Sequence, residues 1–396
     1  MSKTPAASKL VDCSSTLSRV GNHLQMGVVG MPNVGKSSLF NLLCKMSIPA
    51  ENFPFCTIDP NLSRCAVPDE RYEWLCEHWK PKSEVPSYLQ ITDIAGLVKG
   101  ASTGAGLGNA FLSHIQQVDG IYHMIRAFEN DEIIHVEDSV DPVRDLDIIS
   151  KELLAKDIEF TNKTLKTLQN SLKNKTIDKA KQVELDTYNK VIALLESGKH
   201  ARYGVYSNAE SEHVRDLRLL TSKPAIYLIN LSEEDFIRKK NKWLAKIKAW
   251  VDENGGGTMI PVSVAFEKAL LDMNSDEERK EYEKTKGAIS NMPKIIKTGY
   301  STLNLINFFT CGKDEVRSWC LQKGSKAPQA AGVIHTDFEK GFIMAETMAY
   351  SDFFELKSEA ECKSRGKYRM EGKNYEVADG DIIFFKFNTA GGNKKK

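Results

Sequence analysis

The sequence lacks long apolar runs and paired cysteine motifs. No hydrophobic stretch approaches the roughly 20 residues that span a bilayer, and the first residues have no apolar block typical of a secretory signal. The 8 cysteines never form C-x-x-C, which excludes the common zinc-ligand spacing and disfavours a disulfide framework. We therefore predict a cytoplasmic protein that is not associated with a membrane.

The chain also has almost no net charge. Its 54 basic and 53 acidic residues leave +1, which excludes a globally basic nucleic-acid-binding protein and a solvating acidic tail. A local basic patch is compatible with this balance, so the charge has to be considered segment by segment.

The length of 396 residues fits two or three domains. We predict a nucleotide-binding domain that is interrupted by a helical insertion and followed by a smaller domain. The predicted segments are a flexible tail (1–22), the first part of the nucleotide domain (23–140), a helical hairpin (141–204), the second part of the nucleotide domain (205–303), a C-terminal domain (304–387) and a basic tail (388–396).

Short apolar runs alternate with segments of helical periodicity. This alternation predicts an α/β fold with a mainly parallel sheet. The candidate strands are Leu24–Gly30, Tyr88–Asp93, Gly120–Ala127, Pro224–Asn230 and Met259–Val264. A second set of short strand-like runs, separated by turns, predicts a small β-rich domain at Thr302–Phe309, Gly332–Thr336, Gly341–Met344 and Ile382–Phe387.

Two segments with apolar residues at a spacing of three and four predict an antiparallel coiled-coil hairpin. Their apolar positions are Leu154, Ile158, Leu165, Leu168 and Leu172, then Leu185, Tyr188, Ile192 and Leu195. The tip carries six lysines and one acid, Asp178, a local charge of +5. It is either a solvated helical face or a basic tip that contacts RNA phosphates. The lysines are Lys163, Lys166, Lys173, Lys175, Lys179 and Lys181.

A phosphate-binding loop begins at Gly30. The run Gly30-Met-Pro-Asn-Val-Gly-Lys-Ser matches G-x-x-x-x-G-K-[ST] and lies between a predicted strand and a predicted helix. In this motif backbone amides surround the phosphates, the lysine neutralises their oxygens and the serine hydroxyl binds Mg²⁺. The predicted nucleotide contacts here are Asn33, Val34, Gly35, Lys36, Ser37 and Ser38.

Two switch elements follow in the order that a G-protein-like site requires. Asp93-Ile-Ala-Gly96 ends a predicted strand, so Asp93 should lie beside the metal and the Gly96 amide near the γ-phosphate. Thr57 supplies a hydroxyl that can reach the metal. We therefore expect Mg²⁺ to be held by Ser37 and Thr57, with Asp93 acting through water.

The base-reading element departs from the guanine-specific N-K-x-D. The chain has Asn230-Leu231-Ser232-Glu233 instead. In N-K-x-D the aspartate accepts hydrogen bonds from guanine N1–H and N2–H₂. A glutamate at that position is one methylene longer, so its carboxylate lies elsewhere, and Leu231 stands where the motif has lysine. This predicts ATP over GTP; the alternative is a conservative Asp-to-Glu change that keeps GTP. Ser263 is placed as the last backbone contact to the base.

These residues resemble the YchF branch of the Obg family. The resemblance rests on G-M-P-N-V-G-K-S, N-F-P-F-C-T-I-D-P-N, D-I-A-G-L-V-K-G-A, F-E-N-D-E-I-I-H-V and N-L-S-E, and on the C-terminal K-A-P-Q-A-A-G-V-I-H-T-D-F-E-K-G. It implies an ATP-preferring P-loop hydrolase with an inserted coiled coil and a C-terminal TGS domain of β-grasp type. It further implies a cytosolic nucleotide switch associated with ribosomes and translational regulation.

The group that activates the attacking water departs from the Ras-like pattern. Ras-like enzymes have a glutamine where this chain has Leu97, which cannot hydrogen-bond to water. The family resemblance points to His135 on a mobile loop, and the alternative is a structural histidine. Asn33 is a candidate K⁺ ligand, as in related hydrolases without the glutamine, or a simple cap of the loop. Slow turnover would suit a ribosome- or RNA-binding module, expected to be monomeric, in which ATP is mainly a conformational ligand.

Overall fold

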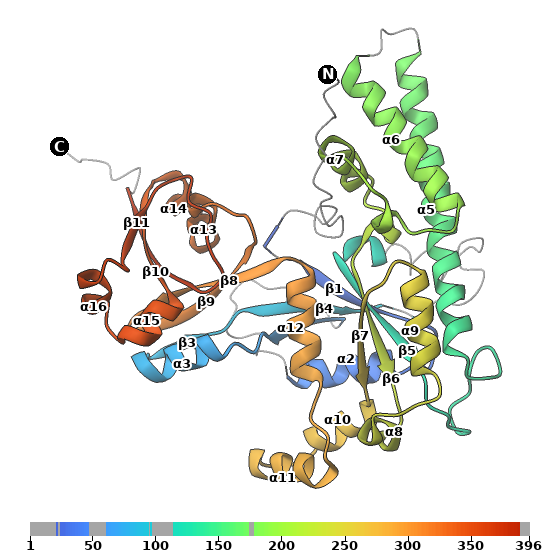
Figure 1. Ribbon diagram of the computed structural model, residues 1–396, viewed down its shortest axis with the longest axis horizontal. Helices are drawn as coiled ribbons and strands as arrows, with labels where there is room; N and C mark the ends of the chain where they lie inside the picture. Colours follow the sequence, from blue (N-terminus) through green and yellow to red (C-terminus); the bar gives the residue numbers. More distant parts are fainter. Residues whose placement is uncertain are drawn as a thin grey trace, which may run out of the picture.

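The computed structural model describes residues 21–22, 24–46, 61–94, 96, 114–173 and 178–388. Its first sheet has the order β2-β4-β1-β5-β6-β7 (Figure 1). All neighbours pair in parallel except β2 and β4, as predicted for a mainly parallel α/β sheet. The strands are β1 (Gln25–Val29), β2 (Leu62–Ala66), β4 (Tyr88–Asp93), β5 (Gly120–Arg126), β6 (Ala225–Asn230) and β7 (Thr258–Val262).

Helices pack on this sheet because its central strands are apolar on both faces. Every residue of β5 is buried, as expected for a strand covered on both sides. The helices around this sheet are α2 (Lys36–Lys45), α8 (Glu233–Arg238), α9 (Leu244–Glu253), α10 (Val264–Leu271) and α12 (Met292–Thr302), with short 3₁₀ turns at Ala201–Tyr203 and Leu220–Ser222. α11 (Asp276–Lys286) buries none of its residues, and α7 (Asn208–Leu217) packs on the helical hairpin instead.

A helical hairpin projects from the same body (Figure 1). Its first helix, α5 (Pro142–Leu172), begins at the N-cap Asp141, whose side chain accepts from the amides of Val143 and Arg144. The 31 residues of α5 span about 46 Å. α6 (Lys179–Glu196) returns beside it, capped by Asp178. Most of the predicted apolar positions are buried or half-buried along the contact, namely Leu154, Ile158, Leu165, Leu168, Leu185, Tyr188, Ile192 and Leu195.

The second sheet has the order β11-β10-β12-β8-β9-β3. Five strands come from the C-terminal part: β8 (Leu305–Cys311), β9 (Glu315–Gln322), β10 (Phe342–Ala349), β11 (Arg369–Glu371) and β12 (Asp381–Phe387). The sixth, β3 (Ser83–Val85), comes from the first hundred residues and pairs with β9. α3 (Glu70–Trp79) packs on this sheet through Leu75 and Cys76. Residues 62–85 therefore contribute to both sheets.

The expected strand at Gly332–Thr336 is wrong. Residues Ala327–Ile334 form α13, and Thr336–Lys340 form α14. Pro328 lies in the first turn of α13, where proline is tolerated, and Ala330 and Ala331 are fully buried against the sheet. Tertiary packing of these small residues outweighs the β-like pattern. The remaining helices are α15 (Tyr350–Leu356) and α16 (Glu359–Ser364). In the described part of the chain no helix is long and apolar enough to cross a membrane.

Candidate nucleotide-binding site

The phosphate-binding loop lies at the carboxyl end of β1 and leads into α2. Gly30 has φ 157° and Gly35 has φ 102°, backbone conformations that other residues rarely adopt. A Cβ on Gly30 would lie 2.4 Å from the carbonyl oxygen of Met124, and one on Gly35 would lie 2.6 Å from Asn230 Nδ2. Both glycines are therefore needed for the tight curl that turns backbone amides toward a phosphate.

The ammonium group of Lys36 is enclosed by this loop. Its Nζ donates to the carbonyl oxygen of Met31 at 2.8 Å, and the residue is 7% exposed. Burial lowers the pKa of Lys36 to about 8, while the nearby carboxylate of Asp93 opposes this shift. Because the buried charge is costly by itself, an anionic phosphate beside it is favourable.

Ser37 and Asp93, which the sequence predicts to hold Mg²⁺, lie side by side. Ser37 Oγ donates to Asp93 Oδ2 at 2.9 Å, since the pairing of β1 with β4 sets Val28 opposite Asp93. The other oxygen, Asp93 Oδ1, is buried and has no hydrogen-bond partner among the described residues. A carboxylate oxygen without a donor, next to a serine hydroxyl, fits Mg²⁺ and its water ligands.

Gly96 lies against the same loop. A Cβ on it would be 3.1 Å from Lys36 Nζ and 3.2 Å from the backbone nitrogen of Pro32. Gly96 is therefore next to Lys36, and the role predicted for its amide stays a prediction. Three other predicted site residues, Thr57, Leu97 and Lys175, lie outside the described residues.

Asn230 at the end of β6 joins two loops of the site. Its Nδ2 donates to the carbonyl oxygen of Val34 at 3.0 Å, and its Oδ1 accepts from the amide of Val264 at 3.2 Å. Asn230 thus fixes the phosphate loop to the turn after β7. Leu231 is buried in the core, and its amide donates to the carbonyl oxygen of Val262 at 2.8 Å.

The carboxylate of Glu233 is held by another helix. Glu233 Oε1 accepts from Lys286 Nζ and from the Tyr282 hydroxyl, each at 2.9 Å. The hydrogen bond from Lys286, followed by that from Tyr282, lowers the pKa of Glu233. The only acid of the N-L-S-E element is therefore ionised and tied to α11.

Three further predicted contacts occupy different environments. Ser263 is fully buried and caps α10, where its Oγ accepts from the amide of Phe266 at 3.4 Å. Val34 is also buried, whereas Ser38 is exposed on the first turn of α2. Of these three side chains, only that of Ser38 is exposed to solvent.

His135 is buried rather than aimed at the phosphate loop. Its Nδ1 accepts from the amide of Glu137 at 3.1 Å, which leaves the proton on Nε2, 2.9 Å from Asp145 Oδ2. Burial raises the pKa of Asp145, opposed by the attraction of His135. Both ring nitrogens are therefore engaged within the fold, and orienting a water would require this loop to move.

The neighbouring residue does contact the phosphate loop. Asn33 Nδ2 donates to the carbonyl oxygen of Ile134 at 3.0 Å, and Asn33 adopts φ 61°, a left-handed conformation that asparagine tolerates. Arg126 holds the same segment, since both of its terminal nitrogens donate to the carbonyl oxygen of Ile133 at 3.0 Å. Sequence reasoning missed Arg126 and Asp145, because an arginine ending a strand and an acid in a first helical turn have ordinary structural explanations.

The described lysines of the hairpin tip are solvent-exposed. Lys163 and Lys166 lie on α5 and Lys173 at its C-cap, while Lys179 and Lys181 open α6. Of the described members, Lys181 has a local partner, Glu184, at 2.6 Å. The ion pair reduces the positive charge on the α6 side of the tip.

A strand, a phosphate-binding loop and a helix, with an aspartate at the end of the adjacent parallel strand, define the P-loop NTPases. Residues 25–171 match the MMR_HSR1 family, described as a 50S ribosome-binding GTPase, and residues 305–388 match YchF-GTPase_C, described as a protein of unknown function (DUF933). The predicted fold class is thereby confirmed.

Similarity to curated relatives extends over nearly the whole chain. The chain is 58% identical to Obg-like ATPase 1 of Oryza sativa subsp. japonica and 55% identical to that of Caenorhabditis elegans, covering 96% of both chains in each case. It therefore belongs to the Obg-like ATPase 1 (YchF) family, as the sequence motifs predicted.

Solved structures agree with this assignment. The YchF GTPase of Schizosaccharomyces pombe is 54% identical, with a TM-score of 0.85 over 93% of this chain and 99% of that one. A GTP-binding protein from Pyrococcus horikoshii OT3 is 17% identical, with a TM-score of 0.58 over 92% of this chain and 100% of that one, and shares the fold alone. The relatives' names include both ATPase and GTPase, so these names do not decide which nucleotide this chain prefers.

Proposed function

We propose that this chain hydrolyses ATP to ADP and phosphate with Mg²⁺ and acts as a nucleotide switch on ribosomes. The observation that carries the choice of ATP is the anchoring of Glu233 to Lys286 and Tyr282. A guanine-specific site needs a carboxylate free to accept two base hydrogens. Here one carboxylate oxygen, Oε1, already accepts two hydrogen bonds that hold the side chain on α11, and Leu231 offers no polar side chain. GTP, the alternative nucleotide, would have to compete with Lys286 and Tyr282 for this acceptor.

The chain's own residues suit charge stabilisation at the β- and γ-phosphates. The amides of the phosphate loop and the ammonium group of Lys36 surround the phosphate position, and Asn230 fixes the loop's shape through Val34. Ser37 and Asp93 would hold Mg²⁺, which supplies positive charge at the phosphate oxygens when bound. Thr57 is the further proposed metal ligand, and Asn33 Oδ1 is the oxygen proposed for K⁺.

A ribosomal partner is supported by the hairpin tip. Lys163, Lys166, Lys173 and Lys179 are exposed and lie toward the end of the hairpin that is far from the start of α5. Polyanionic RNA is a partner that such a basic tip fits. The description of the matching family as ribosome-binding supports the same choice. We propose a cytoplasmic monomer in which nucleotide state sets the hairpin's pose.

A slow-turnover binding module is the second candidate. It is favoured by the orientation of His135, whose two ring nitrogens bond to Glu137 and Asp145 instead of facing the phosphate loop. In that case ATP acts mainly as a conformational ligand. His135 becomes a water-orienting group only if its loop rearranges.

Parallel titrations with ATP and GTP test the proposal. The full chain with Mg²⁺ should bind ATP at least tenfold more tightly than GTP in calorimetry, and should release phosphate from ATP in single-turnover assays. Preference for GTP would overturn the proposal that the N-L-S-E element disfavours guanine. Tight ATP binding without measurable phosphate release would select the binding module.

A further inference from the structure

A second basic surface runs from the end of α8 across the following loop to the first turns of α9. Residues 238–248 contain six basic residues and no acid, a denser positive charge than that of the hairpin tip. All six side chains are exposed to solvent. We call this set the α9 patch: Arg238, Lys239, Lys240, Lys242, Lys246 and Lys248.

Half of the α9 patch is not neutralised by acids of the chain. Three members form surface ion pairs: Arg238 with Glu234, Lys242 with Glu129 and Lys248 with Asp252. Every side chain in these pairs is more than half exposed, so solvent screens the pairs and an incoming anion can compete for the cation. The ammonium groups of the other three, Lys239, Lys240 and Lys246, form no ion pair with the acids that the structure describes.

The backbone that carries these charges is fixed to the nucleotide domain. Asn241 anchors the loop, since its Nδ2 donates to the carbonyl oxygen of Ala127 at 2.9 Å and its Oδ1 accepts from the amide of Trp243 at 2.8 Å. On α9, Ile247 is fully buried. A surface that is ordered before its partner arrives loses less conformational entropy on binding.

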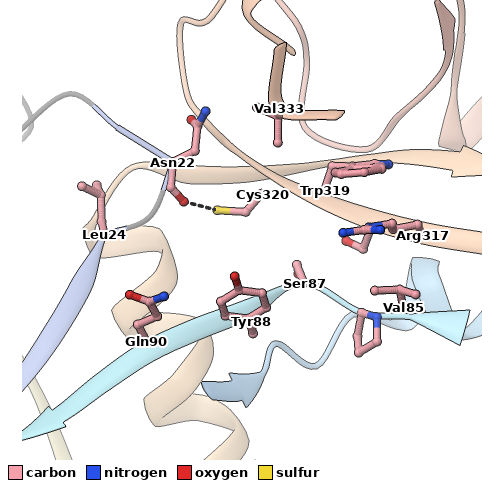
Figure 2. A pocket seen from close by; sticks show the side chains of 12 residues that line it. Asn22, Leu24, Val85, Ser87, Tyr88, Gln90, Arg317, Trp319, Cys320 and Val333 are labelled. Carbon is pink, nitrogen blue, oxygen red and sulfur yellow. Dashed lines mark hydrogen bonds between the residues drawn. The ribbon is translucent and has the colours of Figure 1, made fainter. Parts of the chain in front are cut away.

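Two lysines of the α9 patch lie over one aromatic ring. The ammonium groups of Lys242 and Lys246 are 5.5 and 4.9 Å from the ring centroid of Trp243. One cation beside a tryptophan is an ordinary packing arrangement, as for Arg317 and Trp319 near the junction of the two sheets (Figure 2). Two like charges at the same ring repel each other, and a phosphate that binds beside both reduces this repulsion.

The side chains of this run favour duplex RNA over a membrane or a single strand. A basic segment that binds membranes has apolar side chains that enter the bilayer, and single strands stack their bases on exposed aromatic rings. The large apolar residues here are buried or half-buried, namely Ile237, Trp243, Leu244 and Ile247. Charge without an exposed apolar or aromatic anchor fits the phosphates of a duplex.

The α9 patch also lies beside the base of the helical hairpin (Figure 1). Trp250 Nε1 on α9 donates to Asp147 Oδ1 on α5 at 2.7 Å. From Asp147, the tip residues Lys163 and Lys173 lie about 24 and 39 Å further along the helix axis. The two basic clusters therefore belong to opposite ends of the hairpin.

We propose that the α9 patch is a second RNA-binding surface, which contacts backbone phosphates of a duplex while the hairpin tip contacts another part of the same RNA. This inference rests on the ribosomal partner proposed above and adds a contact on the nucleotide domain. The contact is independent of base sequence, because exposed lysines bind phosphates as point charges. Lys239, Lys240 and Lys246 provide its main part, since they have no ion pair to exchange.

Fluorescence anisotropy of the full chain with a labelled 20-base-pair RNA duplex tests the proposal. Changing Lys239, Lys240 and Lys246 to glutamine should weaken binding at least tenfold at low salt. The slope of log K against log salt should fall by about two to three, at roughly 0.9 for each lost phosphate contact.

The matched control changes three exposed lysines of α11 and α12 to glutamine and should alter the affinity at most twofold. These lysines are Lys280, Lys294 and Lys297. Absence of duplex binding by the unaltered chain, or equal losses in the two triple variants, overturns the proposal.

A variant that strengthens binding guards against losses caused by misfolding. Glu129→Gln releases Lys242 from its ion pair, so the affinity for the duplex should rise several-fold. Glu281→Gln, at an exposed glutamate of α11, should have little effect. Equal affinities of these two variants overturn the assignment of the contact to the α9 patch.

Changing Lys163, Lys166 and Lys173 to glutamine separates this inference from the proposed function. If the α9 variant loses both duplex binding and ribosome sedimentation, the inference holds whatever the tip variant does. If both depend on the tip alone, the inference fails while the proposed function stands. Phosphatidylserine vesicles form a parallel arm, and binding that depends on the α9 patch for vesicles but not for RNA overturns the inference.

Discussion

His135 Nε2 lies 2.9 Å from Asp145 Oδ2, so the proposed water-orienting histidine is bound to the first turn of the long hairpin helix. The residue before it, Ile134, accepts a hydrogen bond from Asn33 of the phosphate loop. The nucleotide site and the hairpin therefore share one short segment. Release of His135 from Asp145 would affect both.

Substituting His135 by alanine tests its catalytic role. If the imidazole orients the attacking water after this loop moves, the kcat for ATP should fall about 100-fold with little change in ATP affinity, since general acid–base groups contribute at this level. Single-turnover phosphate release and calorimetry measure the two quantities. His335→Ala, at an exposed histidine of the C-terminal domain, is the control.

The same experiment extends to the histidine's partner. Asp145→Asn keeps the size of the side chain but weakens its hold on the imidazole, so kcat should rise several-fold. That gain should vanish in the His135→Ala background. An unchanged kcat in His135→Ala would remove the catalytic assignment and leave His135 as a structural residue.

Two substitutions should shift the nucleotide preference from ATP toward GTP. Leu231→Lys with Glu233→Asp restores N-K-x-D and shortens the acid so that it no longer reaches Lys286 and Tyr282. One bidentate carboxylate–guanine contact is worth about 1–3 kcal/mol, so the GTP-to-ATP affinity ratio should rise roughly 5- to 150-fold. Competition binding measures the ratio. Glu234→Asp is the matched control, and a ratio that stays constant in the double variant contradicts the proposed role of this element.

Two substitutions at Asn33 distinguish a K⁺ ligand from a residue that only holds the segment at Ile134. Asn33→Asp tolerates φ 61° and keeps an oxygen for K⁺, but loses the donor to Ile134. If Asn33 is a K⁺ ligand, stimulation by K⁺ over Na⁺ should persist in Asn33→Asp and disappear in Asn33→Gly. Steady-state ATPase rates in the two salts decide this. Loss of K⁺ stimulation in both variants would favour the contact with Ile134 as the important one.

Nucleotide binding should depend on pH through Lys36. Its pKa in the free protein is about 8, lowered from 10.5 by burial. Below pH 8 the ammonium form is present and binds phosphate directly. Above pH 8 binding must first take up a proton, so the Kd for ATP should rise by up to tenfold per pH unit until the pKa of the complex is reached.

Calorimetry between pH 7 and 9.5, in buffers of different ionisation enthalpy, measures this proton uptake. A rise in pH above 8 weakens ATP binding but has the opposite effect on folding, which it stabilises. The unfolded chain holds more protons than the native one between pH 8 and 10.5, so this lysine's contribution to the free energy of unfolding rises across that window. A Kd that is flat from pH 7 to 9.5 contradicts the lowered pKa.

The hairpin tip should contribute to ribosome association through charge. Reversal of Lys163, Lys166 and Lys173 to glutamate should weaken binding and reduce the dependence of log K on log salt by about one for each lost phosphate contact. Sedimentation with ribosomes across a salt series measures both. The matched control reverses the exposed Lys280, Lys294 and Lys297, which lie on α11 and α12. Equal losses in both triple variants would reject a specific tip contact.

Local sequence patterns were sufficient to predict the nucleotide loop and most strands. Gly30 and Gly35 are dictated by backbone geometry that glycine alone adopts easily, and Tyr88–Asp93 forms a strand over its full predicted length. The spacing of apolar residues likewise predicted the hairpin helices, because helical periodicity is a local property. It misassigned Gly332–Thr336, where the burial of Ala330 and Ala331 against a sheet determines a helix.

The sequence by itself determined a P-loop α/β domain, an inserted hairpin and the Obg-like family, since each can be recognised from short stretches of consecutive residues. Only the tertiary structure decided which groups those motifs meet. It ties Glu233 to Lys286 across 53 positions, turns His135 toward Asp145, and pairs Val85 of β3 with Arg317 in the second sheet. These contacts join residues that are distant in sequence, or depend on the path of a loop. Their energies depend on burial and mutual orientation, which no local pattern encodes.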